Sequence, residues 1–410
     1  MCRQLSLLIA LVSISIVLLG CSGAKELDER ANVIAVGLDT GEQEDMVRVS
    51  YQFAVPQTES GKEAAEKSSF VITNSASSIA EALNLISSEI ALQPSVAHVK
   101  VIVIGEEQAR KGLGNILSPF MRYYEYRGSI FVLVARGTAK DFLEKNKPIL
   151  VNSLSKYYEL MLAGGENSGY FLGTSLHQFY MRLKSHSAQP YMALVGINPK
   201  SGEGEKSISK VPGGKIDGYK AGDIPRHGGN PAEFAGTALF FGDKMVGTLS
   251  TTETRMLAML IGKYSHGFLS VEDPLDPKSF INISLQLGSK PKIKTAIVEG
   301  HPVIHVSILL EGNISSIGSG INYEQENYLK LLEGQINKVY QQEMINLIRR
   351  TQELDADVAG FGDYLRPVFQ TNKELEDYQW NQKYRQAEVF VDINTKVRRN
   401  GLMLRTLPVE

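Results

Sequence analysis

The stretch at residues 199–231 carries almost no large apolar side chain. It reads PKSGEGEKSISKVPGGKIDGYKAGDIPRHGGNP and is crowded with Gly, Pro, Lys and Ser. Such a stretch cannot bury enough apolar surface to offset the chain entropy lost on folding, so it predicts a long loop or linker. We therefore expect an N-terminal region at 21–198 and a C-terminal region at 233–410, with residues 199–232 between them.

The N-terminal region alternates short apolar strands with amphipathic helices. Residues 98–105 form a near-continuous apolar run, which is typical of a strand covered on both faces. Residues 191–197 close the region as another strand, and the pattern between them predicts helices, including one over 149–162. This alternation indicates a mixed α/β region. A further division into two subdomains, 21–147 and 148–198, stays open.

The C-terminal region begins with a strand hairpin whose turn is Gly242-Asp243. Ser250 and Glu253 follow at the spacing of a capping box, which marks the start of a helix. Several strands come next, then a long amphipathic helix that begins near Glu324, and then a last strand. We therefore predict an α+β, multi-domain chain with two to three mixed α/β domains. Its C-terminal domain would pack antiparallel strands on long helices.

An apolar run that ends in a cysteine occupies the N-terminus. Residues 1–20 carry a single charge, Arg3, and no other charge comes before Cys21. This is the layout of a secretory signal peptide, and the run is short for a membrane span. Leu18-Leu19-Gly20-Cys21 resembles the bacterial lipobox, in which diacylglycerol is attached to the cysteine. We therefore predict a lipoprotein signal peptide at 1–20 and lipid attachment at Cys21. The alternative is an ordinary signal peptide that is cut nearby.

Processing as a lipoprotein would leave neither cysteine of the chain free to form a disulfide. Cys2 would leave with the signal peptide, and Cys21 would carry the lipid. An exported protein without thiols depends on buried apolar surface for its stability. Two or more acyl chains hold a protein firmly at a bilayer. The formal net charge of −2 argues against nucleic-acid binding, which needs a basic excess.

The sequence contains no recognisable catalytic or cofactor-binding pattern. A P-loop, a Gly-x-Ser-x-Gly elbow and a His-Glu-x-x-His motif are all absent. His301 and His305 come nearest to a metal-ligand pair, but on the predicted strand they lie roughly 13 Å apart. Zinc needs each nitrogen at about 2.1 Å. Trp380 is expected to be a core side chain. We predict no enzyme, no cofactor and no metal site.

A series of short motifs runs in order along nearly the whole chain. In the N-terminal region they are Lys25-Glu26-Leu27-Asp28, Gly37-Leu38-Asp39, Ile79-Ala80-Glu81-Ala82, His98 to Arg110 and Ala135-Arg136-Gly137. In the C-terminal region they are Gly242 to Gly247, Glu253-Thr254-Arg255, Gln352, Asp357, Phe361-Gly362, Trp380 and Arg398-Arg399-Asn400-Gly401. This succession resembles the Ger(x)C family, the lipoprotein C subunits of spore germinant receptors. Thr248 stands where many members carry tryptophan and Asn400 where threonine is common, so both depart from the family pattern.

The resemblance implies a non-enzymatic subunit, anchored by diacylglycerol on Cys21 at the outer face of the spore inner membrane. Its partners would be the A-type and B-type subunits of the receptor, one of which spans the membrane many times. Two other interpretations stay open: a solute-binding lipoprotein of a transporter and a lipid-anchored hydrolase. Solute-binding lipoproteins usually have two doubly wound lobes, which the predicted C-terminal region does not resemble.

Overall fold

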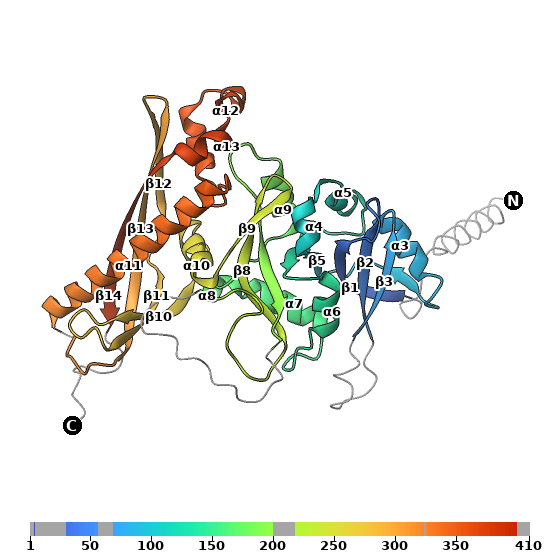
Figure 1. Ribbon diagram of the computed structural model, residues 1–410, viewed down its shortest axis with the longest axis horizontal. Coiled ribbons are helices and arrows are strands. Elements are labelled where there is room, and N and C mark those ends of the chain that lie inside the picture. The colour runs from blue at the N-terminus through green and yellow to red at the C-terminus, as the bar shows by residue number, and fades with distance from the viewer. Residues whose placement is uncertain (1–3, 5–29, 56–68, 200–217, 324, 400–410) are drawn as a thin grey trace.

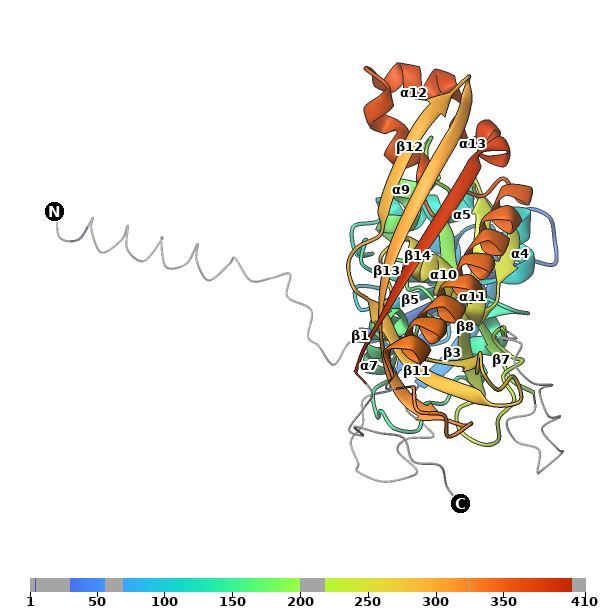
Figure 2. The same ribbon diagram turned by 90° about the vertical axis from the view of Figure 1, so that its left-hand side faces the viewer.

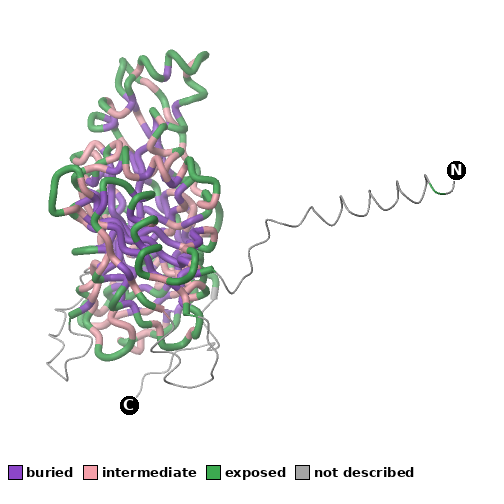
Figure 3. The backbone as a smooth tube through the Cα atoms, turned by 90° about the vertical axis from the view of Figure 1, so that its right-hand side faces the viewer, coloured by how far each residue is buried: buried purple, intermediate pink, exposed green. Residues whose placement is uncertain are grey.

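Two β-sheets lie side by side along the long axis of the molecule (Figure 1). The computed structural model describes residues 4, 30–55, 69–199, 218–323 and 325–399. Helices cover faces of both sheets, and buried segments run through the centre of the described chain (Figure 3). The α+β, multi-domain architecture predicted from the sequence is confirmed.

The first sheet has four parallel strands at its centre and an antiparallel pair of strands on each side. The apolar runs predicted to be strands supply the centre, where most residues are buried on both faces. In spatial order the strands are β3 (Ser69–Ala76), β2 (Val47–Ala54), β1 (Arg30–Thr40), β5 (Val101–Gly105), β6 (Phe131–Ala135), β7 (Tyr191–Ile197), β8 (Ala232–Phe241) and β9 (Lys244–Leu249). The short β4 (Gln93–Ser95) pairs with the start of β1.

Two layers of helices cover the first sheet. One layer consists of α3 (Ile79–Ile86), α4 (Glu106–Lys111), α5 (Gly114–Arg122) and α9 (Leu176–Leu183). The other consists of α6 (Ala139–Lys145) and α7 (Leu154–Ala163), and the short α8 (Gly165–Ser168) follows. Figure 1 shows α4 and α5 above the sheet and α6 below it.

The helix predicted over 149–162 begins later than the apolar pattern suggests. Ser153 accepts the backbone N–H of Lys156 and caps α7, which therefore starts at Leu154. Residues 149–152 consequently lie in the loop between α6 and α7. Apolar side chains in this loop extend the helical pattern without belonging to the helix.

The first sheet contains strands from both sides of residues 199–232, the predicted linker. β7 ends at Ile197 and β8 begins at Ala232, and these two residues lie opposite each other in an antiparallel pair. Strands β8 and β9 therefore complete the sheet to which the N-terminal region contributes. Residues 200–217 lie outside the described part of the chain. The division into 21–198 and 233–410 stays a prediction, and the sheet has no break there.

The second sheet is built on one long strand. Its strands are β10 (His266–Glu272), β11 (Phe280–Leu287), β12 (Lys292–Val298), β13 (His301–Ile317) and β14 (Glu388–Arg399). β11 and β12 pair antiparallel with successive parts of β13, as the sequence predicts for this region. β14 differs, since it pairs parallel with β13. The chain crosses over between these two strands, and a parallel pair requires such a crossover.

The long helix predicted from near Glu324 is α11 (Glu326–Glu353), which lies against the second sheet (Figure 2). Its polar side chains also bond to the free edge of β14. Gln341 Nε2 donates to the carbonyl of Val391 (2.6 Å), and Asn337 Oδ1 accepts from Thr395 N (2.8 Å). Glu333 Oε1 accepts from Val397 N (2.8 Å). The three helical residues are four positions apart, so they form one stripe that covers this edge.

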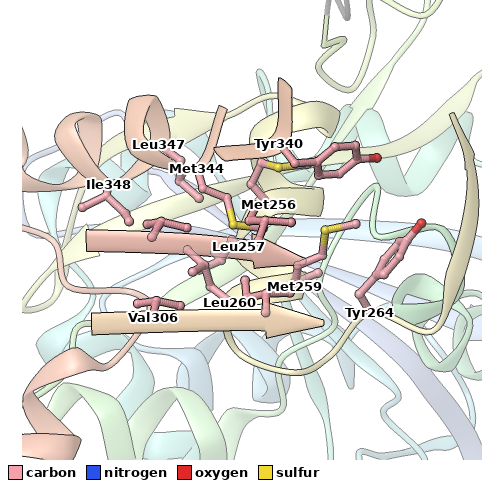
Figure 4. Close-up of a cluster of buried hydrophobic side chains, with 14 of the residues drawn as sticks. Met256, Leu257, Met259, Leu260, Tyr264, Val306, Tyr340, Met344, Leu347 and Ile348 are labelled. Atoms are coloured by element: carbon pink, nitrogen blue, oxygen red, sulfur yellow. The ribbon is translucent and has the colours of Figure 1, made fainter. Parts of the chain in front are cut away.

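The helix α10 (Thr251–Leu260) connects the cores of the two sheets. Met256 and Leu257 lie between α11 and strands of the second sheet (Figure 4). Leu239 and Leu249, from β8 and β9 of the first sheet, belong to the same buried cluster. The two sheets therefore share one continuous apolar core at their junction.

Short helical elements join α11 to β14. They are η3 (Phe361–Val368), α12 (Asn372–Tyr378), α13 (Trp380–Lys383) and η4 (Tyr384–Gln386). Trp380 is fully buried, which confirms the prediction that it is a core side chain. Within the described ranges, we find no helix whose length and apolar content would let it span a membrane.

A buried carboxylate explains the Gly-x-Asp motif in β1. Asp39 accepts hydrogen bonds from the backbone N–H groups of Ala139 (2.7 Å) and Lys140 (3.0 Å), the first two residues of α6. Thr138 caps the same helix with its side chain. A Cβ on Gly37 would lie only 3.2 Å from that of Ala139, so glycine allows the helix to approach the strand. The motif thus fixes the N-terminus of α6 on the sheet.

We expect Asp39→Ala to lower the free energy of unfolding by about 1–3 kcal/mol, because two N–H groups at the start of α6 lose their acceptor. Chemical denaturation of the purified protein measures this change. Asp45→Ala is the matched control, because Asp45 is exposed and should change stability by less than about 0.5 kcal/mol. Equal effects of the two substitutions would contradict the assigned role of Asp39.

Candidate functional site: a polar junction between the two sheets

Asp357 is a fully buried carboxylate just beyond the end of α11. Its Oδ1 accepts the backbone N–H groups of Gly360 (2.8 Å) and Phe361 (3.0 Å). Its Oδ2 accepts the backbone N–H of Gly362 (2.9 Å) and the indole N–H of Trp380 (2.8 Å). Each oxygen therefore accepts two hydrogen bonds from the protein, which uses the acceptor sites of the group.

The four N–H donors around Asp357 fit the ionised form of its carboxylate. Burial raises its pKa to about 6, and the hydrogen bonds from Gly362, Phe361 and Trp380 act in the opposite direction. The nearby positive charge of Arg182 also lowers the pKa. A buried charge is tolerated when donors surround it, as they do here.

Asp357 also connects the C-terminal part of the chain to the first sheet. Its carbonyl oxygen accepts the backbone N–H of Gln189 (2.8 Å), which lies just before β7. Arg182 of α9 donates through Nη1 to the carbonyls of Gln189 (2.8 Å) and Val358 (2.9 Å). We call Arg182, Gln189, Asp357, Gly362 and Trp380 the Asp357 cluster. This cluster ties the segment after α11 to the N-terminal part of the chain.

Glycines allow the close packing within the Asp357 cluster. A side chain at Gly362 would collide with the carbonyl oxygen of Ser187 and with the ring of Trp380. Gly360 has a φ of 76°, in the left-handed region that favours glycine. The turn that aims three backbone N–H groups at one carboxylate therefore depends on these two glycines.

A second contact between the two sheets involves Arg350 of α11. Its guanidinium donates to the carboxylate of Glu253 (2.8 Å) and to the backbone carbonyl of Thr248 (2.8 Å). Glu253 and Ser250 form the capping box of α10 that the sequence predicts. Thr248 contributes only its carbonyl to this contact, which any residue could supply.

Arg255 makes a third contact at the same junction, and it is nearly buried. It donates through Nε to the carbonyl of Ser168 (3.2 Å) and through Nη1 to the carbonyl of Phe268 (3.3 Å). Its guanidinium lies 4.9 Å from the ring centre of Tyr170, close enough for a cation–π contact. Arg255 thus joins α8, in the N-terminal part of the chain, to β10 of the second sheet.

Gln352 fixes the end of α11 to the start of β14. Its Nε2 donates to the carbonyls of Tyr384 (3.0 Å) and Ala387 (2.8 Å). The motif side chains Glu253, Arg255, Gln352, Asp357 and Trp380 therefore all bond to other parts of the fold. Their hydrogen bonds hold segments of the protein together.

The Gly242-Asp243 turn docks on the first helical layer. The carboxylate of Asp243 accepts the N–H groups of Leu113 (3.1 Å) and Gly114 (2.9 Å) at the start of α5. A cavity of about 470 Å³ lies beside this turn, and Glu44 and Lys111 are among the residues that line it. Charges of both signs thus line this cavity.

The residues singled out from the sequence fall in separate places. Cys21, the predicted lipid site, lies outside the described residues. His301 and His305 are exposed on β13, and the ring of His305 stacks on Phe390 with centres 5.0 Å apart. The described residues contain no group of three or more metal-ligating side chains placed to hold an ion. From the sequence alone, Asp39 and Arg182 had no predicted physical role.

We expect Asp357→Asn to lower the free energy of unfolding by at least about 1–3 kcal/mol, because an amide nitrogen cannot accept N–H donors and leaves them unsatisfied. Trp380 is the single tryptophan of the chain, so its fluorescence during denaturation reports on the site directly. Asp377→Asn is the matched control, since Asp377 is exposed on α12. Unfolding midpoints that agree with the native protein for both variants would show that the cluster adds no stability.

Two family models match the chain, one on each side of residues 198–234. "Spore germination protein N-terminal domain" matches residues 23–197. "Spore germination B3/GerAC like, C-terminal" matches residues 235–401. Residues at the junction between the sheets come from both matched regions, with Arg182 and Gln189 in the first and Asp357 in the second.

Similar proteins cover nearly the whole chain. Putative spore germination protein YfkR of Bacillus subtilis (strain 168) is 23% identical over 400 residues, which is 96% of each chain. Spore germination protein B3 of the same strain is 27% identical over 389 residues, covering 93% of this chain and 94% of that protein. The crystal structure of the GerBC protein has the same fold, with a TM-score of 0.54 at 20% identity, over 89% of this chain and 98% of that one. The chain belongs to the Ger(x)C family of spore germination proteins.

Proposed function

We propose that this protein is a lipid-anchored, non-catalytic subunit of a spore nutrient-germinant receptor. Diacylglycerol on Cys21 would hold it at the outer face of the spore inner membrane. It would act through contacts with the A-type and B-type subunits of the receptor. The observation that carries the proposal is the match to both spore germination models, at residues 23–197 and 235–401.

The use of the motif side chains supports a scaffolding role. Asp357 bonds only within the protein through both carboxylate oxygens, and Glu253 bonds to Arg350 and to the start of α10. A general acid or base has to reach a substrate proton at hydrogen-bond distance. Asp357 is fully buried, so it cannot serve a bound polymer or metabolite in this conformation.

The second sheet supports the receptor-subunit proposal over a solute-binding lipoprotein. Four of its strands form an antiparallel arrangement, with β14 added in parallel. A second doubly wound lobe would instead alternate parallel strands with helices on both faces. The chain thus lacks, in its described part, the pair of similar lobes expected of that class.

Replacing Cys21 tests the anchor. We expect Cys21→Ala to move the protein from the membrane fraction to the soluble fraction of spore lysates, because no acyl chain can be attached. Nutrient-triggered germination should be impaired in the same spores. Cys2→Ala is the matched control, since Cys2 lies within the predicted signal peptide, and it should leave both readouts unchanged. A Cys21→Ala protein that stays in the membrane and supports normal germination would overturn the proposal.

Purification of the intact complex tests the partners. We expect this chain, tagged at its C-terminus and extracted from dormant-spore membranes in mild detergent, to bring down two further germination subunits. One of them should span the membrane many times. Mass spectrometry identifies them, and the Cys21→Ala protein is the control for association that depends on the membrane. Recovery of a nutrient transporter's components in their place would favour the solute-binding alternative.

A further inference from the structure

Two adjacent apolar side chains project from the loop between α6 and α7. Ile149 is 69% exposed and Leu150 is 96% exposed, directly after Pro148. A single exposed apolar side chain on a surface needs no explanation, but two neighbours at a loop tip form a small apolar patch. We call residues 147–151 the 147–151 loop.

The base of this loop is fixed by buried polar contacts. Asn146 is buried, donates through Nδ2 to the hydroxyl of Tyr158 (3.1 Å) and accepts from Nδ2 of Asn230 (2.7 Å). Oδ1 of Asn230 accepts the backbone N–H of Lys147 (2.9 Å). Ser153 ends the loop by capping α7. The tip is therefore held outward by hydrogen bonds on both sides, and it does not fold back onto the core.

Three lysines lie close to the tip in the sequence. The sequence from residue 145 to residue 158 contains Lys145, Lys147 and Lys156 and no acidic residue. All three lysines are exposed. Lys145 pairs with Asp141 (3.2 Å) and Lys156 pairs with Glu159 (3.8 Å), so Lys147 supplies the positive charge of the tip itself. An apolar tip that carries Lys147 at its base matches the two layers of an anionic membrane surface, where acyl chains lie beneath negative head groups.

The predicted lipid anchor lies within reach of the same face. Cys21 and Arg30, the first residue of β1, are nine positions apart, so the connecting chain spans at most about 30 Å. The helices on either side of the loop pack on the sheet that contains β1 (Figure 1). Tyr158 of α7 donates to Oε1 of Gln52 on β2, the neighbour of β1. A bilayer held by Cys21 can therefore contact this face.

We propose that the 147–151 loop inserts Ile149 and Leu150 into the interface of an anionic bilayer. The loop is then a second membrane contact, which sets how the protein is oriented above the bilayer. This inference rests on the proposed lipid anchor at Cys21. The ligand is the lipid surface, and Lys147 contributes through attraction to its negative head groups.

The test uses the lipidated full chain, purified from bacterial membranes and reconstituted into vesicles of phosphatidylglycerol and phosphatidylcholine. Leu150→Cys provides one thiol for an environment-sensitive fluorophore, because a lipidated Cys21 does not react. Tyr124→Cys is the matched control. Tyr124 is 84% exposed and follows α5, on the opposite face of the first sheet.

We expect the label at position 150 to shift its emission to the blue and to be quenched by spin-labelled lipid. The label at position 124 should show neither effect. In the Leu150→Cys background, Lys147→Ser should reduce the shift on anionic vesicles. With Lys147 in place, pure phosphatidylcholine vesicles should give a smaller shift than the anionic vesicles do.

The outcomes separate the two proposals. A protein that does not float with the vesicles, and whose Cys21 takes up the label, contradicts the anchor itself. A protein that floats but shows the same emission at positions 150 and 124 overturns the loop inference and leaves the anchor standing. Protection of position 150 only after receptor subunits are added would also overturn it, since the loop would then contact protein.

Discussion

The arrangement of the two sheets depends on a buried negative charge. Asp357 is removed from water, and four N–H groups of the protein replace the water it has lost. Three of these groups come from one glycine-containing turn, and the fourth comes from the indole of Trp380. These hydrogen bonds fix the path of the turn that follows α11. The hydrogen bond from the backbone N–H of Gln189 to the carbonyl of Asp357 then joins this turn to the first sheet.

The local elements of this fold could be predicted from sequence, because their signals are local. The 28-residue helix α11, the capping box before α10 and the burial of Trp380 each depend on periodicity or on residue type within a short window. The pairing of β7 with β8 depends on residues on either side of a long polar stretch. No local pattern states which strands will be neighbours, so the continuity of the first sheet was not predicted.

The same limit applies to the junction between the sheets. Asp357 and Gln352 appeared in the sequence only as members of a motif series, without a physical role. Their roles become visible when residues far apart in the chain, such as Arg182 and Val358, are brought together. Asp39 is similar, since its partners at the start of α6 lie 100 positions away. An acidic residue at the end of a buried strand, with glycine two positions before it, is the signal that could have identified it.

The polar stripe of α11 has a consequence for proteins crowded on a surface. A strand edge with free N–H and C=O groups can extend its sheet with a strand of any neighbouring molecule. The side chains of Glu333, Asn337 and Gln341 occupy three of those groups on β14 within the same molecule. Copies confined to one plane meet far more often than copies diluted in three dimensions. On this side of the second sheet, such encounters find a strand edge that α11 already covers in part.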